Sequence, residues 1–266
     1  MASCRACSGC GTALPESAAD QVTPALALQG LDKSFGGLPA LSAVSLQVKP
    51  GERRLIIGPN GAGKTTLFNL ITGDLRPDGG TIRMFGEEVQ RLPTHRRVHR
   101  CMARTYQMIT LFPRETLAHN VLLSLLGLTP ARWNPVVPLA RRTALAARAR
   151  EILARVGLEQ LAERPLAQVS YGEKRRVEIA MALAQEPKLL LLDEPLAGLS
   201  REERFSVQAL LEEIPRDITV VMIEHDMDTA LSFAERITLL HYGRVLVEGT
   251  RAEVVAHPKT REVYLG

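Results

Sequence analysis

Apolar residues are spaced in two ways along this chain, and the two spacings predict strands and helices. Largely apolar runs predict strands that are buried on both faces of a parallel sheet, at residues 54–57, 189–192, 218–223 and 237–240. Strict alternation at Val44, Leu46 and Val48 predicts a half-buried strand. Further strands are indicated at residues 26–31, 81–85 and 245–247.

Helices are predicted in residues 65–72 and 172–185 and in the largely helical stretch 115–168, where apolar residues recur at helical spacing in 117–122 and 141–156. Turns that contain glycine or proline separate these elements, at residues 36–37, 50–51, 78–80 and 242–243. Strands that alternate with helices indicate an α/β fold with a parallel sheet. Ligands of such sheets bind beyond the carboxyl ends of the strands, so residues that follow strands are candidates for a functional site.

One glycine-rich stretch lies between a predicted strand and a predicted helix. It fits the phosphate-binding pattern G-x-x-x-x-G-K-[ST] and reads Gly58-Pro59-Asn60-Gly61-Ala62-Gly63-Lys64-Thr65, followed by Thr66. Glycines let backbone N–H groups wrap phosphate oxygens, and the helix N-terminus adds partial positive charge. Lys64 can reach the β- and γ-phosphates, and Thr65 offers a hydroxyl to Mg²⁺. This P-loop predicts binding of a nucleoside triphosphate.

Two acids and a histidine follow other predicted strands. Residues 189–195 resemble the Walker B element, in which an acid at the strand end, here Asp193, holds Mg²⁺ opposite Thr65. Glu194 can orient or deprotonate an attacking water. His225 follows the strand at 218–223 and is expected to converge with them. A solvated acid pair is the alternative, but it does not account for the P-loop upstream.

Composition narrows the class of protein. The chain has 266 residues, 45% of them hydrophobic, which supports one large α/β unit or two small ones. Its net charge of +4 permits an anionic partner, but no basic stretch is interleaved with aromatic residues, so nucleic acid is not a predicted partner. No apolar run is long enough to span a membrane, so any membrane role is expected to come through a partner.

Three segments have no settled interpretation from the sequence. Residues 1–24 are predicted to be a disordered tail, with a metal site as the alternative because of the cysteines Cys4, Cys7 and Cys10. The arginine-rich segment 91–104 is interpreted as a solvated helix face or as a docking surface near Gln107. The proline-broken insert within 127–142 has no predicted role.

Residues 169–176 read Val-Ser-Tyr-Gly-Glu-Lys-Arg-Arg and resemble the signature motif of the ABC transporter ATPases, usually Leu-Ser-Gly-Gly-Gln. Ser170 and Gly172, which matter for phosphate contact in that family, are kept, whereas Val169, Tyr171 and Glu173 depart from the pattern. The resemblance extends from about residue 25 to residue 266, because the remaining family motifs follow in order. It implies a P-loop NTPase core with a mostly parallel sheet, an antiparallel β subdomain and a helical subdomain at about 112–168.

The resemblance also assigns roles to single residues. Phe35 matches the aromatic residue that stacks on adenine, and Gln107 matches the Q-loop glutamine, which senses Mg²⁺ and water and faces the membrane partner. Residues 197–200 match the D-loop, with Ser200 in place of the usual aspartate. His225 matches the switch histidine near the γ-phosphate.

The family mechanism follows from these matches. Two chains, identical or related, are expected to stack head to tail with each ATP between the P-loop of one and the signature residues of the other, here Ser170, Tyr171, Gly172 and Glu173. The catalytic residues are expected to be Lys64, Glu194 and His225, and the Mg²⁺ site to be formed by Thr65, Gln107 and Asp193. Closure and hydrolysis are expected to drive integral membrane permeases, with the chain peripheral on the cytoplasmic face of the inner membrane.

Within the family, the chain most resembles ATPase subunits of bacterial branched-chain amino-acid importers, in residues 35–41, 67–73, 223–227 and 262–266 and in the Ser-Tyr-Gly-Glu form of the signature. Such importers use two ATPase subunits, two permeases and a periplasmic substrate-binding protein. Relatives that import urea or amides or energise lipopolysaccharide export are alternatives, and a non-transport ABC ATPase is a more distant one. The transported substrate is chosen by proteins outside this chain.

Overall fold

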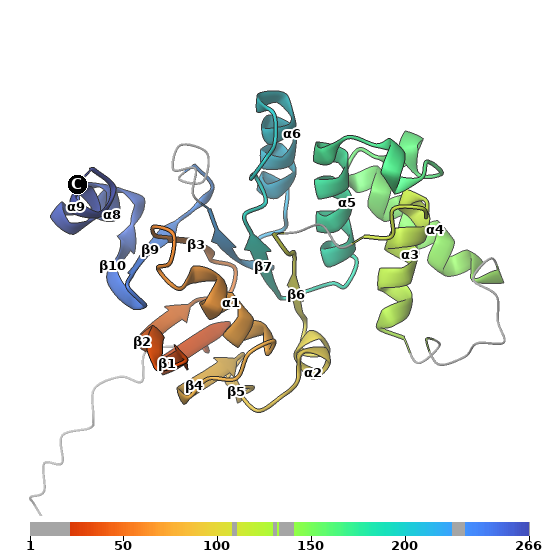
Figure 1. Ribbon diagram of the computed structural model, residues 1–266. Coiled ribbons are helices and arrows are strands. Elements are labelled where there is room, and N and C mark those ends of the chain that lie inside the picture. Colours follow the sequence, from red (N-terminus) through yellow and green to blue (C-terminus); the bar gives the residue numbers. More distant parts are fainter. Residues whose placement is uncertain (1–21, 108–110, 130–131, 133–140, 225–231, 266) are drawn as a thin grey trace, which may run out of the picture.

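The computed structural model describes residues 22–107, 111–129, 132, 141–224 and 232–265 (Figure 1). The expected tail, with Cys4, Cys7 and Cys10, lies almost wholly outside the described residues, as do His225 and most of the insert within 127–142. The division into a tail, an ATP-binding domain and a helical subdomain at about 112–168 stays a prediction. None of the helices in the described part of the chain is long and apolar enough to cross a membrane.

A six-stranded sheet forms the centre of the molecule, in the order β10-β9-β3-β8-β7-β6. Its strands are β3 (Arg53–Ile57), β6 (Met102–Arg104), β7 (Leu189–Asp193), β8 (Thr219–Ile223), β9 (Arg236–His241) and β10 (Arg244–Thr250). All neighbours are parallel except β10, which runs antiparallel to β9. Every residue of β3, β7 and β8 is buried, which confirms strands covered on both faces.

A second sheet is antiparallel and has the order β2-β1-β4-β5. Its strands are β1 (Leu26–Phe35), β2 (Leu38–Val48), β4 (Gly79–Met84) and β5 (Glu87–Glu88). The predicted turn at 78–80 is wrong, because Gly79 and Gly80 belong to β4. At Gly80 a Cβ atom would lie 2.3 Å from the carbonyl oxygen of Gly30, so this glycine allows β1 to approach closely. Phe85 lies beyond β4 in a left-handed turn conformation, so the predicted strand ends one residue earlier.

Helix α1 (Lys64–Thr72) packs between the two sheets through its buried residues Leu67, Phe68, Leu70 and Ile71. The remaining helices of the described residues are α2 (Thr94–Val98), α3 (Leu117–Gly127), α4 (Thr143–Arg155), α5 (Tyr171–Leu183), α6 (Arg201–Glu212), α8 (Arg251–Ala256) and α9 (Pro258–Leu265), with short 3₁₀ turns at Glu159–Leu161 and Leu166–Gln168. Buried residues of α3, α4, α5 and α6 share a core with the opposite face of the central sheet.

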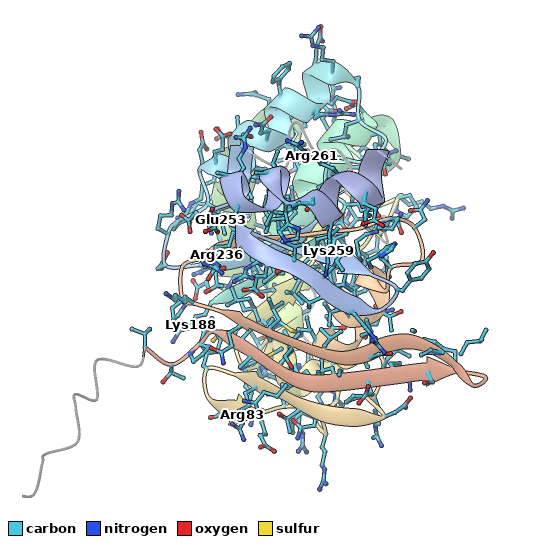
Figure 2. All side chains as sticks on the ribbon, turned by 90° about the vertical axis from the view of Figure 1, so that its left-hand side faces the viewer. Arg83, Lys188, Arg236, Glu253, Lys259 and Arg261 are labelled. Carbon is cyan, nitrogen blue, oxygen red and sulfur yellow. The ribbon has the colours of Figure 1, made fainter. Side chains whose placement is uncertain are left out.

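The C-terminal helices cover β10 at one end of the molecule (Figure 2). Val254 is buried in the core, whereas the labelled side chains of Glu253, Lys259 and Arg261 are exposed. Apolar periodicity did not predict α6, α8 and α9. The sequence signal for α6 and α8 was their capping boxes, which pair Ser200 with Glu203 and Thr250 with Glu253.

The basic segment 91–104 is not simply a solvated helix face. Arg97 is completely buried and donates to four backbone carbonyl oxygens, those of Leu70, Ile71, Gln90 and Leu92. Two of these carbonyls belong to the last turn of α1, where a cation is favourable. Burial lowers the pKa of Arg97 to about 10, so the side chain stays charged at neutral pH. Arg97 is therefore unavailable for docking a partner.

Replacing Arg97 with methionine is expected to lower the free energy of unfolding by about 3 kcal/mol or more, because several buried carbonyls lose their donor. Arg96 is exposed on the same helix, so Arg96→Met should change that free energy by no more than about 0.5 kcal/mol. Urea unfolding of both variants measures the difference. Equal effects would contradict the structural role of Arg97.

Candidate functional site

The glycine-rich loop leaves β3 at Ile57 and enters α1 at Lys64. Gly63 has a left-handed backbone, with φ 100°, and a Cβ atom there would lie 2.7 Å from the carbonyl oxygen of Ala40. At Gly58 a Cβ atom would lie 2.2 Å from the carbonyl oxygen of Leu240. Glycine is therefore required at both ends of the loop, which is pressed against neighbouring backbone.

The loop borders a cavity of about 310 Å³. Its lining residues come from four separate parts of the chain and are Ala40, residues 60–66, Gln107 and Glu194. Residues 60–66 of the predicted P-loop thus meet Gln107 and Glu194 at one site, whereas Gly58, Pro59 and Asp193 are not among the residues that line the cavity. Phe35, at the end of β1, is half exposed and is not among the residues that line the cavity. Its predicted contact with adenine stays a prediction.

Lys64 is buried and bends back over the loop. Its Nζ donates to the carbonyl oxygens of Gly58 at 2.7 Å and Pro59 at 3.0 Å. Burial lowers the pKa of Lys64, and the nearby carboxylates of Glu194 and Asp193 oppose this shift. A phosphate group in the cavity would offer the ammonium stronger acceptors than the two carbonyls.

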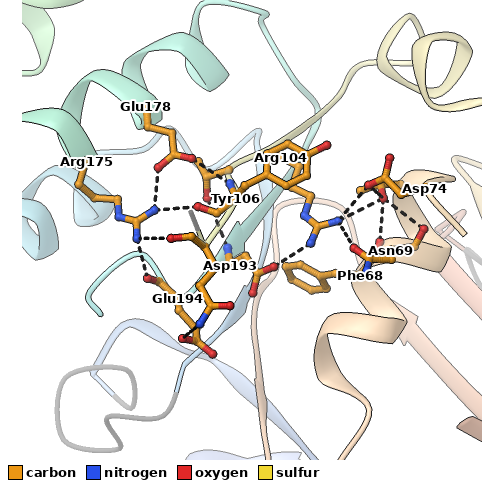
Figure 3. Close-up of polar contacts among 12 residues, drawn as sticks. Phe68, Asn69, Asp74, Arg104, Tyr106, Arg175, Glu178, Asp193 and Glu194 are labelled. Carbon is orange, nitrogen blue, oxygen red and sulfur yellow. Dashed lines mark hydrogen bonds and ion pairs between the residues drawn. The ribbon is translucent and has the colours of Figure 1, made fainter. Parts of the chain in front are cut away.

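Asp193 is the last residue of β7 and Glu194 follows it, and the two carboxylates have different surroundings. Asp193 Oδ2 accepts a hydrogen bond from Arg104 at 2.7 Å, whereas its buried Oδ1 has no hydrogen-bond partner among the described residues (Figure 3). A carboxylate oxygen without a hydrogen-bond partner is a ligand that a hard cation such as Mg²⁺ prefers, and the hydroxyl of Thr65, a residue that lines the cavity, is a second oxygen ligand of this kind. These residues therefore fit the expected Mg²⁺ site.

Glu194 is held in a strained conformation. Its φ of 48° lies in the left-handed region, which costs a non-glycine residue about 1 to 3 kcal/mol. The backbone N–H of Glu194 donates to Ile223 of β8, and Glu194 Oε2 accepts a hydrogen bond from Gln107 Nε2 at 2.9 Å. Such strain is concentrated at functional sites, and here it aims a carboxylate into the cavity.

The signature residues lie elsewhere. Ser170 caps α5 in a capping box with Glu173, and none of the four residues 170–173 lines the cavity of its own chain. The N–H of Gly172 donates to Glu203 Oε1 at 2.8 Å, which lowers the pKa of Glu203 together with hydrogen bonds from Ser200. Ser200, which replaces the usual aspartate, caps α6, a role that serine and aspartate fill equally well.

Two buried arginines at the site were not assigned a role from the sequence. Arg104 bridges Asp193 to Asn69 of α1, and Arg175 of α5 contacts the backbone of Gln107 and Glu194 (Figure 3). A signal for Arg175 existed, because Glu178 follows it at the i,i+3 spacing of a helical ion pair. His225 lies outside the described residues, so its predicted approach to the γ-phosphate stays a prediction.

Residues 41–197 match the family described as ABC transporter. The high-affinity branched-chain amino acid transport ATP-binding protein BraF of Pseudomonas aeruginosa is 37% identical over 91% of this chain and 98% of its own length. The corresponding LivG protein of Escherichia coli K12 is 36% identical, also over 91% of this chain and 98% of its own length. The lipopolysaccharide export ATP-binding protein LptB of Acidithiobacillus ferridurans is 37% identical over 91% and 96%.

Solved structures of ATP-binding cassettes are also similar to this chain. A nucleotide-free ATP-binding cassette from an ABC transporter superposes with a TM-score of 0.82 at 29% identity, covering 91% of this chain and 99% of that one. A dimeric post-hydrolysis cassette bound to ADP and phosphate has a TM-score of 0.72 at 29% identity, covering 85% and 98%.

Proposed function

This chain belongs to the ABC transporter family as an ATPase subunit, and from that premise we propose that it energises the import of branched-chain or other hydrophobic amino acids through separate membrane permeases. The ATP-driven part of the proposal is carried by one observation, and the substrate class by the relatives. A single cavity gathers the P-loop, Gln107 and Glu194 from three distant segments.

The proposed chemistry is in-line attack of water on the γ-phosphate. The amides of the P-loop and the ammonium of Lys64 bind the phosphates, and Lys64 exchanges its contacts with Gly58 and Pro59 for phosphate oxygens. Glu194 exchanges its contact with Gln107 for the attacking water and accepts its proton. Thr65, Asp193 and Gln107 would hold Mg²⁺, which neutralises phosphate charge when bound.

The site of one chain is incomplete without a second ATPase subunit, identical or related. Residues 170–173 do not line the cavity of their own chain, which supports their binding the ATP of the partner subunit. The hydroxyl of Ser170 is a donor suited to a γ-phosphate, and the N–H of Gly172 would exchange Glu203 Oε1 for a phosphate oxygen. ATP then joins the two subunits, and hydrolysis separates them.

The joining and separation of the two ATPase subunits drives the permeases in the membrane. The chain is peripheral on the cytoplasmic face, and a periplasmic binding protein delivers the amino acid. Relatives that act in branched-chain amino acid transport match nearly their whole length, which supports this substrate class. Lipopolysaccharide export is the second candidate, because LptB is equally similar.

Co-expression with the permeases of an amino-acid importer is expected to give a membrane complex that takes up leucine only with ATP and the binding protein. The measurement is uptake of labelled leucine into proteoliposomes, with Glu194→Gln as the inactive control. A chain that instead co-purifies with an exporter complex, and supports no leucine uptake, would reject the substrate class while leaving the ATPase assignment intact.

A further inference from the structure

The Q-loop leaves the central sheet directly after β6. The last ladder bond runs from the N–H of Thr105 to the carbonyl of Leu191, at 2.9 Å. Tyr106 then has both backbone groups taken by α5, since its N–H donates to Glu178 Oε1 at 2.9 Å and its carbonyl accepts from Arg175 at 2.9 Å. The two side chains thus replace a neighbouring strand for this residue.

Arg175 also holds the two residues that the proposed chemistry uses. Its guanidinium is fully buried, donates to the carbonyl oxygens of Gln107 at 3.2 Å and Glu194 at 3.4 Å, and pairs with Glu178 Oε2 at 2.6 Å (Figure 3). The side chain of Gln107 in turn donates to Glu194. One arginine of α5 therefore touches the backbone of both members of the Gln107–Glu194 contact.

Stability alone does not explain this buried pair. Burial raises the pKa of Glu178, and Arg175 opposes the shift, so the pair bears a desolvation cost. Replacing both members of a buried ion pair by apolar residues of similar volume is often neutral for stability. A fork of donors that reaches three carbonyls offers what an apolar side chain cannot, namely a defined placement of the Q-loop and the strand end.

Helix α5 has the signature residues at its start, and Arg175 lies just over one turn further along. We propose that Arg175, together with Glu178, is a positioning residue that couples the signature helix to the active site of its own chain. ATP of the partner subunit, bound at Ser170 and Gly172, sets the position of α5. Because Arg175 of α5 donates to the backbone of Gln107 and Glu194, the position of α5 determines the positions of these two residues. The inference rests on the proposed head-to-tail dimer.

The double variant Arg175→Met/Glu178→Leu tests this coupling. It removes both charges of the pair together, so it should lose less stability than Arg175→Met alone, which leaves Glu178 buried and unpaired. Because the backbone groups of Tyr106, Gln107 and Glu194 lose partners, turnover is measured per folded molecule. Phosphate release at saturating ATP is expected to fall about 10- to 100-fold, the scale of a displacement of about 1 Å in an active site. The ATP concentration for half-maximal rate should change less than about 2-fold, because the P-loop is untouched.

A second measurement separates positioning from general damage. Closure uses the P-loop and the signature, so the double variant should accumulate an ATP-bound dimer on size-exclusion chromatography even though Glu194 is intact. Arg53→Met is the matched control. Arg53 is also buried and donates to three carbonyls, those of Ile214, Pro215 and Ile218, but away from the cavity. It should lower stability and leave turnover per folded molecule unchanged.

Turnover within about 2-fold of the wild type in the double variant would overturn the inference, as would lost turnover without an accumulated dimer. If the double variant does not fold, Arg175→Lys takes its place. It should show the same loss of turnover and the same ATP-bound dimer, because a single ammonium cannot donate to all the acceptors of the guanidinium. The proposed function is tested separately by Glu194→Gln alone. If Glu194→Gln forms no dimer with ATP, by itself or with a related subunit, the head-to-tail dimer fails. If it dimerises and the double variant behaves as wild type, only the coupling fails.

Discussion

Replacing Glu194 with glutamine is expected to lower the rate of ATP hydrolysis by about 10²- to 10⁴-fold, the usual contribution of a general base. Glutamine keeps the shape of the side chain and can still accept the hydrogen bond from Gln107 Nε2, which is 2.9 Å long in the structure. It cannot accept the proton of water. Lys64, Thr65 and Asp193 are unchanged, so ATP still binds and the ATP-bound dimer accumulates.

Phosphate release and size-exclusion chromatography with ATP measure the two effects, for the chain alone and with a related second subunit. Glu202→Gln provides the control, because Glu202 is an exposed acid in the first turn of α6, outside the cavity. Hydrolysis by the Glu194→Gln protein at nearly the wild-type rate would refute the assignment of the base.

Replacing Lys64 with alanine is expected to weaken ATP binding itself, by about 30- to 4,000-fold. This range corresponds to the loss of one partner from a buried, hydrogen-bonded charge pair, about 2 to 5 kcal/mol. Lys64 is buried beside the cavity, and its Nζ donates to the carbonyl oxygens of Gly58 and Pro59.

Titration with a fluorescent ATP analogue measures the affinity, and a melting curve checks the fold. Lys49→Ala is the control, because Lys49 is exposed and lies outside the cavity. Together, Glu194→Gln and Lys64→Ala separate ATP hydrolysis from ATP binding. Nearly unchanged affinity in Lys64→Ala would contradict the assigned phosphate contact.

The core of the fold was predictable because its strands are buried on both faces. Continuous apolar runs predicted β3, β7, β8 and β9, and the structure places them side by side in the central sheet. Parallel strands end at the same edge, so the P-loop and Glu194 were expected to meet, and both line one cavity. Strand β6 was not predicted, because three residues are too few to show a period.

The arginines were predicted less well. Arg97 and Arg104 belong to a segment interpreted by its charge, yet both are almost inaccessible. A guanidinium can be buried when carbonyl or carboxylate oxygens from other segments accept hydrogen bonds from its N–H groups. The carbonyl of Leu70 does so for Arg97, and the carboxylate of Asp193 does so for Arg104. The identity of those acceptors depends on which segments meet in space, and this information is absent from local charge patterns.

The sequence by itself determined the P-loop chemistry and the class of fold, because glycines, Lys64 and buried strands act through local backbone geometry and hydrophobic burial. It also placed Glu194 at a strand end, where a parallel sheet gathers ligands. Only the tertiary structure decided that one carboxylate oxygen of Asp193 accepts a hydrogen bond from Arg104 while the other has no partner among the described residues. It also decided that Arg175 donates to the backbone carbonyls of Gln107 and Glu194. Hydrogen bonds require atoms within about 3.5 Å, and in this chain those atoms come from segments that only folding brings together.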